Sequence, residues 1–145
     1  MKKFGFSILV LLFAGMLAGI ASAQGMRELM TITIPFDFVA GNQSLPSGEY
    51  YVLGSSVHSL IWIRNLDRKR VTVENTIPFK GLEAAAYSAL QFHRYGDTYF
   101  LHKIVLAGQD MAKVVLKSTR EREVKLASAK PSIVILKTAD ASTKR

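Results

Sequence analysis

The sequence predicts an all-β protein with one short helix near the C-terminus, built as an antiparallel β-sandwich or a small β-barrel of about eight strands. Short apolar or alternating segments recur along the chain, and turn residues such as Gly, Pro and Asn separate them. The dipeptide Gly96-Asp97 lies between two such segments and is the sharpest hairpin signal. The chain contains no cysteine, so a hydrophobic core has to stabilise the fold without disulfides.

The first 23 residues have the three-part layout of a secretory signal peptide. Lys2 and Lys3 precede an apolar stretch over 6–20, and Ala21-Ser22-Ala23 supplies small residues where a signal peptidase cleaves. This stretch is shorter than the roughly 20 residues that a membrane span needs. We therefore expect an exported chain, periplasmic or secreted, that starts at Gln24 and has no transmembrane span after processing. An uncleaved N-terminal anchor is the alternative.

The rest of the chain has the length of one ordinary domain. We expect 1–23 to be the signal peptide, 24–137 a single β domain, and 138–145 a disordered polar tail. The sequence does not predict an oligomeric state.

Two strands are predicted in the first part of this domain. Residues 31–38 alternate between apolar and polar side chains, as a half-buried strand does. The side chains expected to face inward are those of Ile32, Ile34, Phe36 and Phe38. Pro35 lacks an amide hydrogen, which places this strand at a sheet edge or at a bulge. A turn-rich loop over 41–48 then leads to a strand over 49–53.

The next segments are predicted to form a hairpin. Residues 60–63 are a continuous apolar run, so we expect this strand to be covered on both faces. A polar connection over 65–69 leads to a return strand over 70–75. In that strand Val71 and Val73 are expected to face inward, with Thr72 and Glu74 outward. The following segment, 80–88, fits either a helical turn or a compact loop.

The second hairpin joins strands over 90–95 and 98–106, and a short strand over 112–117 follows it. If Tyr95 pairs with Thr98, then His93 lies opposite Phe100 and Gln91 opposite His102. The two histidines would then be diagonal neighbours on one face, about 7–8 Å apart at the backbone.

The helix prediction depends on Ser118-Thr119-Arg120-Glu121, which fits a capping box. The Ser118 hydroxyl would accept the Glu121 amide hydrogen while the Glu121 carboxylate reaches back. We expect a helix from Thr119 to about Ala129, with Glu121 and Lys125 as a pair four residues apart. A charged strand is the alternative. Pro131 would end the helix, and 133–136 is predicted to be a final buried strand.

Three parts of the chain, taken together, carry a resemblance. They are Ile34–Phe38 leading into Leu45–Tyr50, then Phe92–Leu101, then Ser118–Glu123. With these segments the chain resembles a family of small, uncharacterised, exported proteins of Acidobacteria-type soil bacteria. The resemblance implies export and a β-rich domain, and it implies no particular chemistry. The stretch Leu45-Pro46-Ser47-Gly48-Glu49-Tyr50 also resembles the turn of transthyretin-like and carboxypeptidase-regulatory-like β-sandwich modules.

Charge is concentrated at the C-terminal end. Residues 24–110 hold eight basic and eight acidic residues, whereas 111–145 hold nine basic and three acidic residues. Such an asymmetry can mark an anionic partner, and it is more commonly an ordinary solvated surface with a polar tail. The candidate anion-binding residues are Arg120, Arg122, Lys125 and Lys130. We expect an acidic envelope polymer or a lipid headgroup as the partner, and no nucleic acid.

Other candidate sites have few supporting features. His93 and His102 would need a third ligand to hold a metal, and no H-x-H or H-E-x-x-H spacing is present. Asp37 and Glu49 flank one loop and are candidates for a paired-carboxylate site. Aromatic residues that are candidates for lining a sugar or lipid site, or for packing in the core, are Tyr50, Tyr51, Trp62, Tyr87, Tyr95 and Tyr99.

No catalytic, cofactor-binding or metal-binding residue is assigned. The sequence favours a non-enzymatic, exported β domain with a binding or structural role at the cell envelope or outside the cell. The alternative is a carrier of a small lipid or sugar with a pocket inside a barrel, and a hydrolase comes third.

Overall fold

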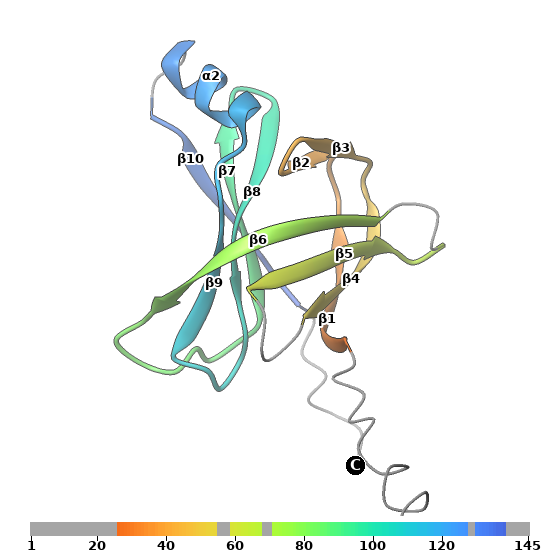
Figure 1. Cartoon of the computed structure of the whole chain (residues 1–145), viewed down its shortest axis with the longest axis vertical. Helices are drawn as coiled ribbons and strands as arrows, with labels where there is room; N and C mark the ends of the chain where they lie inside the picture. The colour runs from red at the N-terminus through yellow and green to blue at the C-terminus, as the bar shows by residue number, and fades with distance from the viewer. Residues whose placement is uncertain (1–25, 55–58, 68–70, 128–129, 139–145) are drawn as a thin grey trace, which may run out of the picture.

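A computed structural model of the chain describes residues 26–54, 59–67, 71–127 and 130–138 (Figure 1). The predicted signal peptide and all but the first residue of the predicted tail lie outside these residues. The described part is mainly β, with ten strands in one mixed sheet and one helix, so the predicted all-β class is confirmed. No helix of this part is long and apolar enough to cross a membrane.

The strands follow the chain in order and the helix precedes the last of them. Their bounds are β1 Arg27–Ile34, β2 Phe38–Ala40, β3 Gln43–Leu45, β4 Gly48–Gly54, β5 Leu60–Asn65, β6 Val71–Lys80, β7 Ala89–Tyr95, β8 Thr98–Val105, β9 Met111–Val115, α2 Thr119–Ala127 and β10 Ser132–Lys137.

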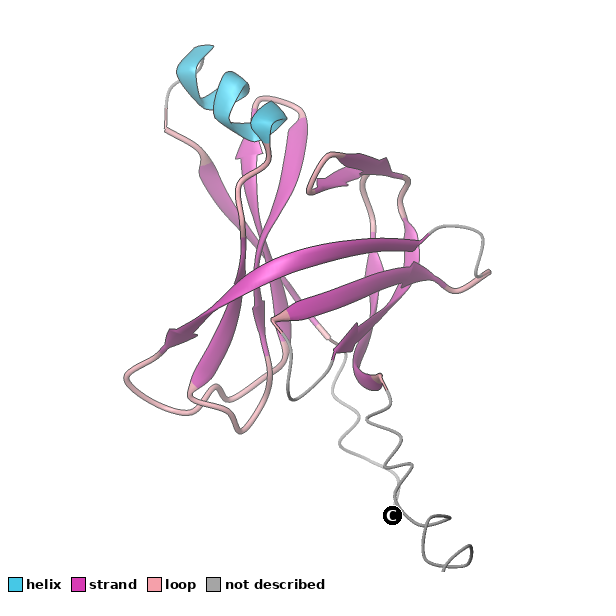
Figure 2. Ribbon diagram, in the orientation of Figure 1, coloured by secondary structure: helices cyan, strands magenta, loops and turns pink. Residues whose placement is uncertain are grey.

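The sheet has two halves that share the long strand β6. Hydrogen-bonded neighbours follow the order β1-β4-β5-β6-β9-β8-β2-β3, while β7 pairs with β8 and β10 pairs with β7. The first part of β6 pairs with β5, and the second part pairs with β9. Figure 2 shows β5 and β6 crossing the direction of β7, β8 and β9. Among the described residues no strand pairing joins β1 to β3, the two ends of this order. The sheet is therefore open and fits a sandwich.

The main core lies between the two halves and is filled by large side chains. Phe38 and Tyr50 meet edge to face with their ring centroids 5.2 Å apart, and Phe38 meets Phe92 in the same way at 5.6 Å. Ile61 and Ile63 from β5 are fully buried in the same cluster. Burial of such side chains is the main favourable term in folding.

The predicted first strand is divided at Pro35. β1 ends at Ile34 and β2 begins at Phe38, because Pro35 has no amide hydrogen to continue the ladder. The predicted inward face is confirmed for Ile32, Ile34 and Phe38, which are buried, while Phe36 is partly buried. One feature departs from an antiparallel sheet, since β2 pairs with β8 in parallel.

The inward face predicted for β6 is wrong. Val71 and Val73 are 41% and 48% exposed, whereas Thr72 is 6% exposed. The register explains the reversal, because Thr72 lies opposite the buried Ile63 of β5. The Thr72 hydroxyl is satisfied there, since it donates a hydrogen bond of 2.8 Å to the Glu74 carboxylate.

The expectation that 60–63 is covered on both faces is also wrong. Trp62 lies opposite Val73 on the outer face and is partly exposed, as is Leu60. The apolar run therefore has one buried face, formed by Ile61 and Ile63.

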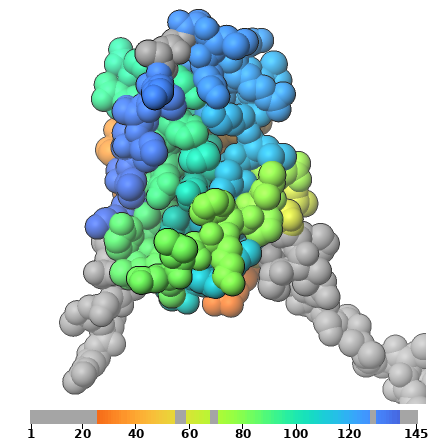
Figure 3. Space-filling model, turned by 90° about the vertical axis from the view of Figure 1, so that its left-hand side faces the viewer, coloured from red at the N-terminus to blue at the C-terminus, as the bar shows by residue number. Residues whose placement is uncertain are grey.

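The final strand is not buried as predicted. β10 pairs only with β7 among the described residues, and Ile133 and Ile135 are 62% and 46% exposed. Figure 3 looks onto the face where β10, in dark blue, lies uncovered beside β7 and β8. Val134 and Leu136 point the other way and are partly buried against the core. An edge strand of a sheet has fewer neighbours to cover it, which explains the exposure.

The second hairpin is confirmed. Tyr95 pairs with Thr98, and Gly96 takes the left-handed conformation of the turn with φ 59°. Residues 81–88 form a loop, which was one of the two alternatives. The helix is confirmed over Thr119–Ala127, and the charged-strand alternative is wrong.

Candidate functional site

The two hairpin histidines lie closer together than the predicted register allows. His93 lies opposite Phe100 as expected, but Gln91 pairs with Lys103 instead of His102. The register shifts between Gln91 and Phe92, so His102 is the extra residue of a β-bulge. The rings of His93 and His102 are stacked, with centroids 3.8 Å apart and planes inclined by 21°.

This stacked arrangement does not suit metal binding. The ring nitrogens of two stacked imidazoles point along parallel planes, whereas a metal needs lone pairs that converge on one point. No group of three or more metal-ligating side chains occurs among the described residues.

Glu121 forms only half of the predicted capping box. Its backbone amide donates a hydrogen bond of 3.1 Å to the Ser118 hydroxyl, which starts the helix as expected. Its carboxylate, however, turns to the sheet and accepts a hydrogen bond of 2.8 Å from His93 Nδ1. The Lys117 ammonium lies 3.8 Å from the same carboxylate oxygen, so Glu121 pairs with Lys117 instead of Lys125.

The His93–Glu121 pair is buried beneath α2. Glu121 is 3% exposed and His93 is 8% exposed. The Tyr95 hydroxyl donates a longer hydrogen bond of 3.4 Å to the same carboxylate. Burial, together with the negative charge of Glu121, raises the pKa of Tyr95. Because the helix covers these groups, the cluster joins α2 to β7 and is closed to a substrate.

A small apolar cluster accompanies the pair. Val39, Tyr95 and Phe100 are buried under α2, and Val124 of the helix packs against them. Figure 1 shows α2 lying across one end of β7 and β8. The helix is therefore held by one polar and one apolar contact with the sheet.

The predicted anion-binding residues lie on the exposed side of α2 and just after it. Arg120, Arg122, Lys125 and Lys130 are all exposed. Arg120 is partly engaged, since its Nη1 donates a hydrogen bond of 2.9 Å to the Ser44 hydroxyl of β3. The spacing places Arg122 and Lys125 on neighbouring positions of one helix side.

The two candidate carboxylates have separate surroundings. Asp37 accepts a hydrogen bond of 2.7 Å from the Ser47 amide and thereby holds the turn before β4. Glu49 is exposed on β4. The described contacts give Asp37 a structural role.

The six candidate aromatic residues do not line one site. Tyr50 is in the core and Tyr95 is under the helix. Tyr99 stacks on Phe36, with ring centroids 3.9 Å apart. Tyr51 and Trp62 remain on the outer face of β4 and β5.

Tyr51 lines a surface hollow that the sequence did not predict. This outer hollow has a volume of about 440 Å³ and lies on the outer face of β1, β4 and β5. Its lining residues are Glu28, Tyr51, Leu53, Arg64 and Leu66. The strand register brings them together, since Tyr51 lies opposite Arg64 and Leu53 lies opposite Glu28.

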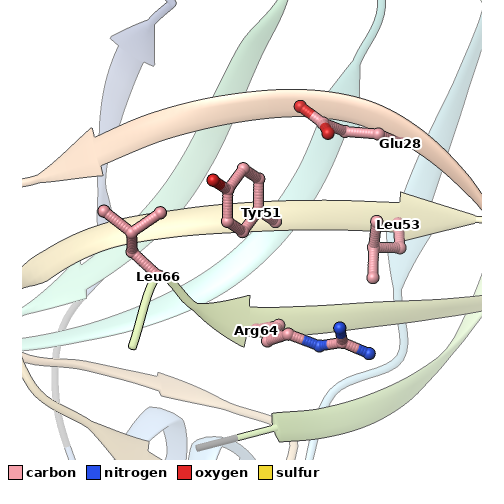
Figure 4. Close-up of a pocket in the computed structure, with 5 residues that line it drawn as sticks. All are labelled: Glu28, Tyr51, Leu53, Arg64 and Leu66. Atoms are coloured by element: carbon pink, nitrogen blue, oxygen red, sulfur yellow. The ribbon is translucent and has the colours of Figure 1, made fainter. Parts of the chain in front are cut away.

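The polar groups of the outer hollow have a specific arrangement. Figure 4 shows Tyr51 between Leu66 and Leu53, with Glu28 and Arg64 on opposite sides of β4. Within the described part of the chain, the Arg64 guanidinium and the Tyr51 hydroxyl make no hydrogen bond or ion pair. Glu28 accepts a hydrogen bond of 2.6 Å from the Thr31 hydroxyl. The hollow thus presents a free cation, a carboxylate and an aromatic ring.

Comparison with protein-family models, with curated proteins and with solved structures finds no significant similarity for this chain.

Proposed function

We propose that the protein is an exported, non-enzymatic binding protein that holds an acidic saccharide unit of an envelope or extracellular polymer in the outer hollow. The observation that carries this proposal is the Arg64 guanidinium, which has no partner in the described part of the chain and lies beside the Tyr51 ring in a hollow that also contains Glu28. Support for export comes from the Lys2-Lys3 start, the apolar stretch after it and the Ala21-Ser22-Ala23 site.

The chemistry of the lining residues matches that of an acidic sugar. A guanidinium presents a planar pair of N–H donors to a carboxylate, which gives strong and directional binding. The C–H groups on one side of a sugar ring contact an aromatic face, and sugar hydroxyls donate hydrogen bonds to a carboxylate such as that of Glu28. Leu53 and Leu66 supply apolar walls at either side of Tyr51.

A binding role is supported over hydrolysis by the number of carboxylates. Glycoside hydrolysis commonly uses two carboxyl groups that flank the scissile bond. Among the described residues that line the outer hollow, Glu28 is the one carboxylate, and it already accepts a hydrogen bond from Thr31.

A carrier with an internal pocket is the second candidate, and the packing of the interior favours it less. Phe38, Tyr50 and Phe92 are fully buried between the two halves of the sheet, and the Phe38 ring contacts the other two rings there. Because side chains fill the interior, a surface site on a sheet face that bears aromatic residues is favoured over an internal pocket.

The basic side of α2 adds an electrostatic contact to the proposal. Arg122, Lys125 and Lys130 are exposed and are available to the charged groups of an acidic polymer. A lipid headgroup is the alternative partner for these cations, and binding to anionic vesicles in place of the polymer would show it.

The test is calorimetric titration of residues 24–145 with a trimer of galacturonic acid and with the neutral trimer maltotriose. We expect saturable binding of the acidic trimer, and a loss of roughly ten-fold in affinity for Arg64→Gln and for Tyr51→Ala. Lys80→Gln is the matched control, because Lys80 is an exposed cation outside the hollow. Equal affinity of Arg64→Gln and the unaltered protein, or no binding of the acidic trimer, would contradict the proposal.

A further inference from the structure

A buried group of ionisable side chains joins α2 to the sheet, and the proposed binding function makes no use of it. His93 of β7 and Glu121 of α2 form a contact of 2.8 Å, and the His102 ring stacks on His93 from the other strand of the hairpin. This group connects a helix to a strand pair at a position that solvent does not reach freely.

His102 is the member without a polar partner. Its Nδ1 is buried and has no hydrogen-bond partner among the described residues. A neutral imidazole tolerates such a position at moderate cost, whereas an imidazolium there would have an unsatisfied N–H and an unpaired charge.

The surrounding groups also disfavour a positive charge on His102. The charged groups that disfavour it include Lys103 on its own strand and Lys117 on the segment before the helix. From β7 it faces His93, and Tyr95 lies on the same face of that strand. Glu121 is the carboxylate of this group, and it already pairs with His93 and Lys117.

The other elements at this position contribute apolar side chains. Val39 of β2 and Phe100 of β8 lie in the cluster under the helix, and Ile133 of β10 lies opposite His93 in the register. These residues provide no counter-charge for a protonated His102.

We propose that acid releases α2 from the sheet, because protonation of the half-buried His102 places a charge beside the buried His93–Glu121 pair, at a site that Lys103 and Lys117 already flank. The helix then loses its hydrogen bond to His93 and its apolar contact through Val124, and its departure uncovers Val39, Tyr95 and Phe100. None of the residues described for the main core cluster belongs to α2, so we expect the core to stay folded when the helix leaves.

The direction of the pH effect follows from the pKa of His102. Burial, and then electrostatic interactions with His93, Lys103 and Lys117, lower the pKa of His102 to about 4. With the helix released, Glu121 no longer holds Lys117 at this site, so the pKa of His102 rises toward its ordinary value of about 6.5. The released form therefore binds more protons between these two values. Docking of α2 is complete above about pH 6.5 and weakens as the pH falls toward 4.

Hydrogen exchange measured by mass spectrometry tests this release. Protection is corrected for intrinsic exchange at each pH, and peptides over 119–127 are compared with core peptides over 89–95. We expect protection of α2 to fall roughly ten-fold between pH 7 and pH 5 while the core stays protected. Glu123→Gln is the matched control on the exposed side of the same helix, and it should behave like the unaltered protein.

Two variants identify His102 as the group that titrates. His102→Phe keeps an aromatic ring for stacking but binds no proton, so α2 should stay protected as the pH falls. His102→Gln serves the same purpose if the larger ring is not tolerated, and the protection of the core peptides reports folding of either variant. An unchanged pH dependence in a folded variant, or an NMR titration of His102 near pH 6.5 with α2 docked, would overturn the proposal.

Discussion

At the scale of single residues, Glu121 connects local helix formation to tertiary structure. Its amide completes the cap with Ser118, and its carboxylate binds His93 across the helix–sheet boundary. A carboxylate near a helix N-terminus is also favoured by the helix dipole. One side chain therefore sets both where α2 begins and where it docks.

Replacing Glu121 by Ala should be costly for this reason. The change leaves His93 buried without its partner, and we expect the free energy of unfolding to fall by about 3 kcal/mol at pH 7. Denaturant titration measures this loss. Glu123→Ala, on the exposed side of the helix, should change stability by no more than about 0.5 kcal/mol. Equal effects of the two substitutions would mean that the buried pair does not stabilise the docked helix.

Phe38 has the corresponding role in the main core. It is 2% exposed and contacts the rings of Tyr50 and Phe92. We expect Phe38→Ala to lower the free energy of unfolding by about 3–5 kcal/mol, which is a large part of the stability of a small domain. Phe79 is 52% exposed, so Phe79→Ala should cost far less in the same denaturation experiment. An unchanged midpoint for Phe38→Ala would refute the central position of this ring.

At the scale of elements, α2 has one side that binds the sheet and another that presents cations. Glu121 and Val124 face β7 and β8, while Arg122 and Lys125 are exposed. The inward side is short, and the helix has nine residues. Its position therefore depends on tertiary contacts more than on its own helical propensity.

The exposed cations should bind acidic polymers in a salt-dependent way. We expect residues 24–145 to be retained on a polygalacturonate column at low salt and to elute as salt rises, because charges at a surface are screened beyond about 8–10 Å. Changing Arg120, Arg122, Lys125 and Lys130 together to Gln should weaken retention without altering affinity for the short acidic trimer. Equal retention of both proteins would show that the C-terminal positive charge is ordinary solvated surface.

At the scale of the whole molecule, the features that the sequence does not predict depend on how strands distant in the chain pair with one another. Alternation identified the inward side of β1, and the Gly96-Asp97 turn fixed the end of the second hairpin. The bulge at His102 has no local signal, because it depends on how β7 and β8 align beyond the turn.

The outer hollow was unpredictable for the same reason. Its residues come from β1, β4, β5 and the turn after β5, and β1 pairs with β4 across two intervening strands of the chain. The alternation in 49–53 indicates that Tyr51 and Leu53 share a side, but the position of Arg64 beside them follows only from the β4–β5 register. In β6 the inward and outward faces are the reverse of the prediction. Thr72 can point inward in place of Val73 because its hydroxyl is hydrogen-bonded to Glu74.

The proposed export concerns the whole chain and has a direct test. Mass spectrometry of the protein from its native host should find Gln24 as the first residue, or its cyclised form, because Ala21-Ser22-Ala23 has the small residues that a signal peptidase requires. A membrane-bound form that retains Met1 would contradict export as a processed protein.

The measurement that tests the central claim most directly is an NMR titration of residues 24–145 with the galacturonic acid trimer. The Nε–Hε signal of Arg64 and the ring signals of Tyr51 report on the outer hollow, and the amide signals of α2 report on the other candidate surface. We predict saturable shifts at Arg64 and Tyr51, with the α2 amides unchanged by this short ligand. Shifts confined to α2, or the absence of any saturable shift at Arg64, would contradict the account.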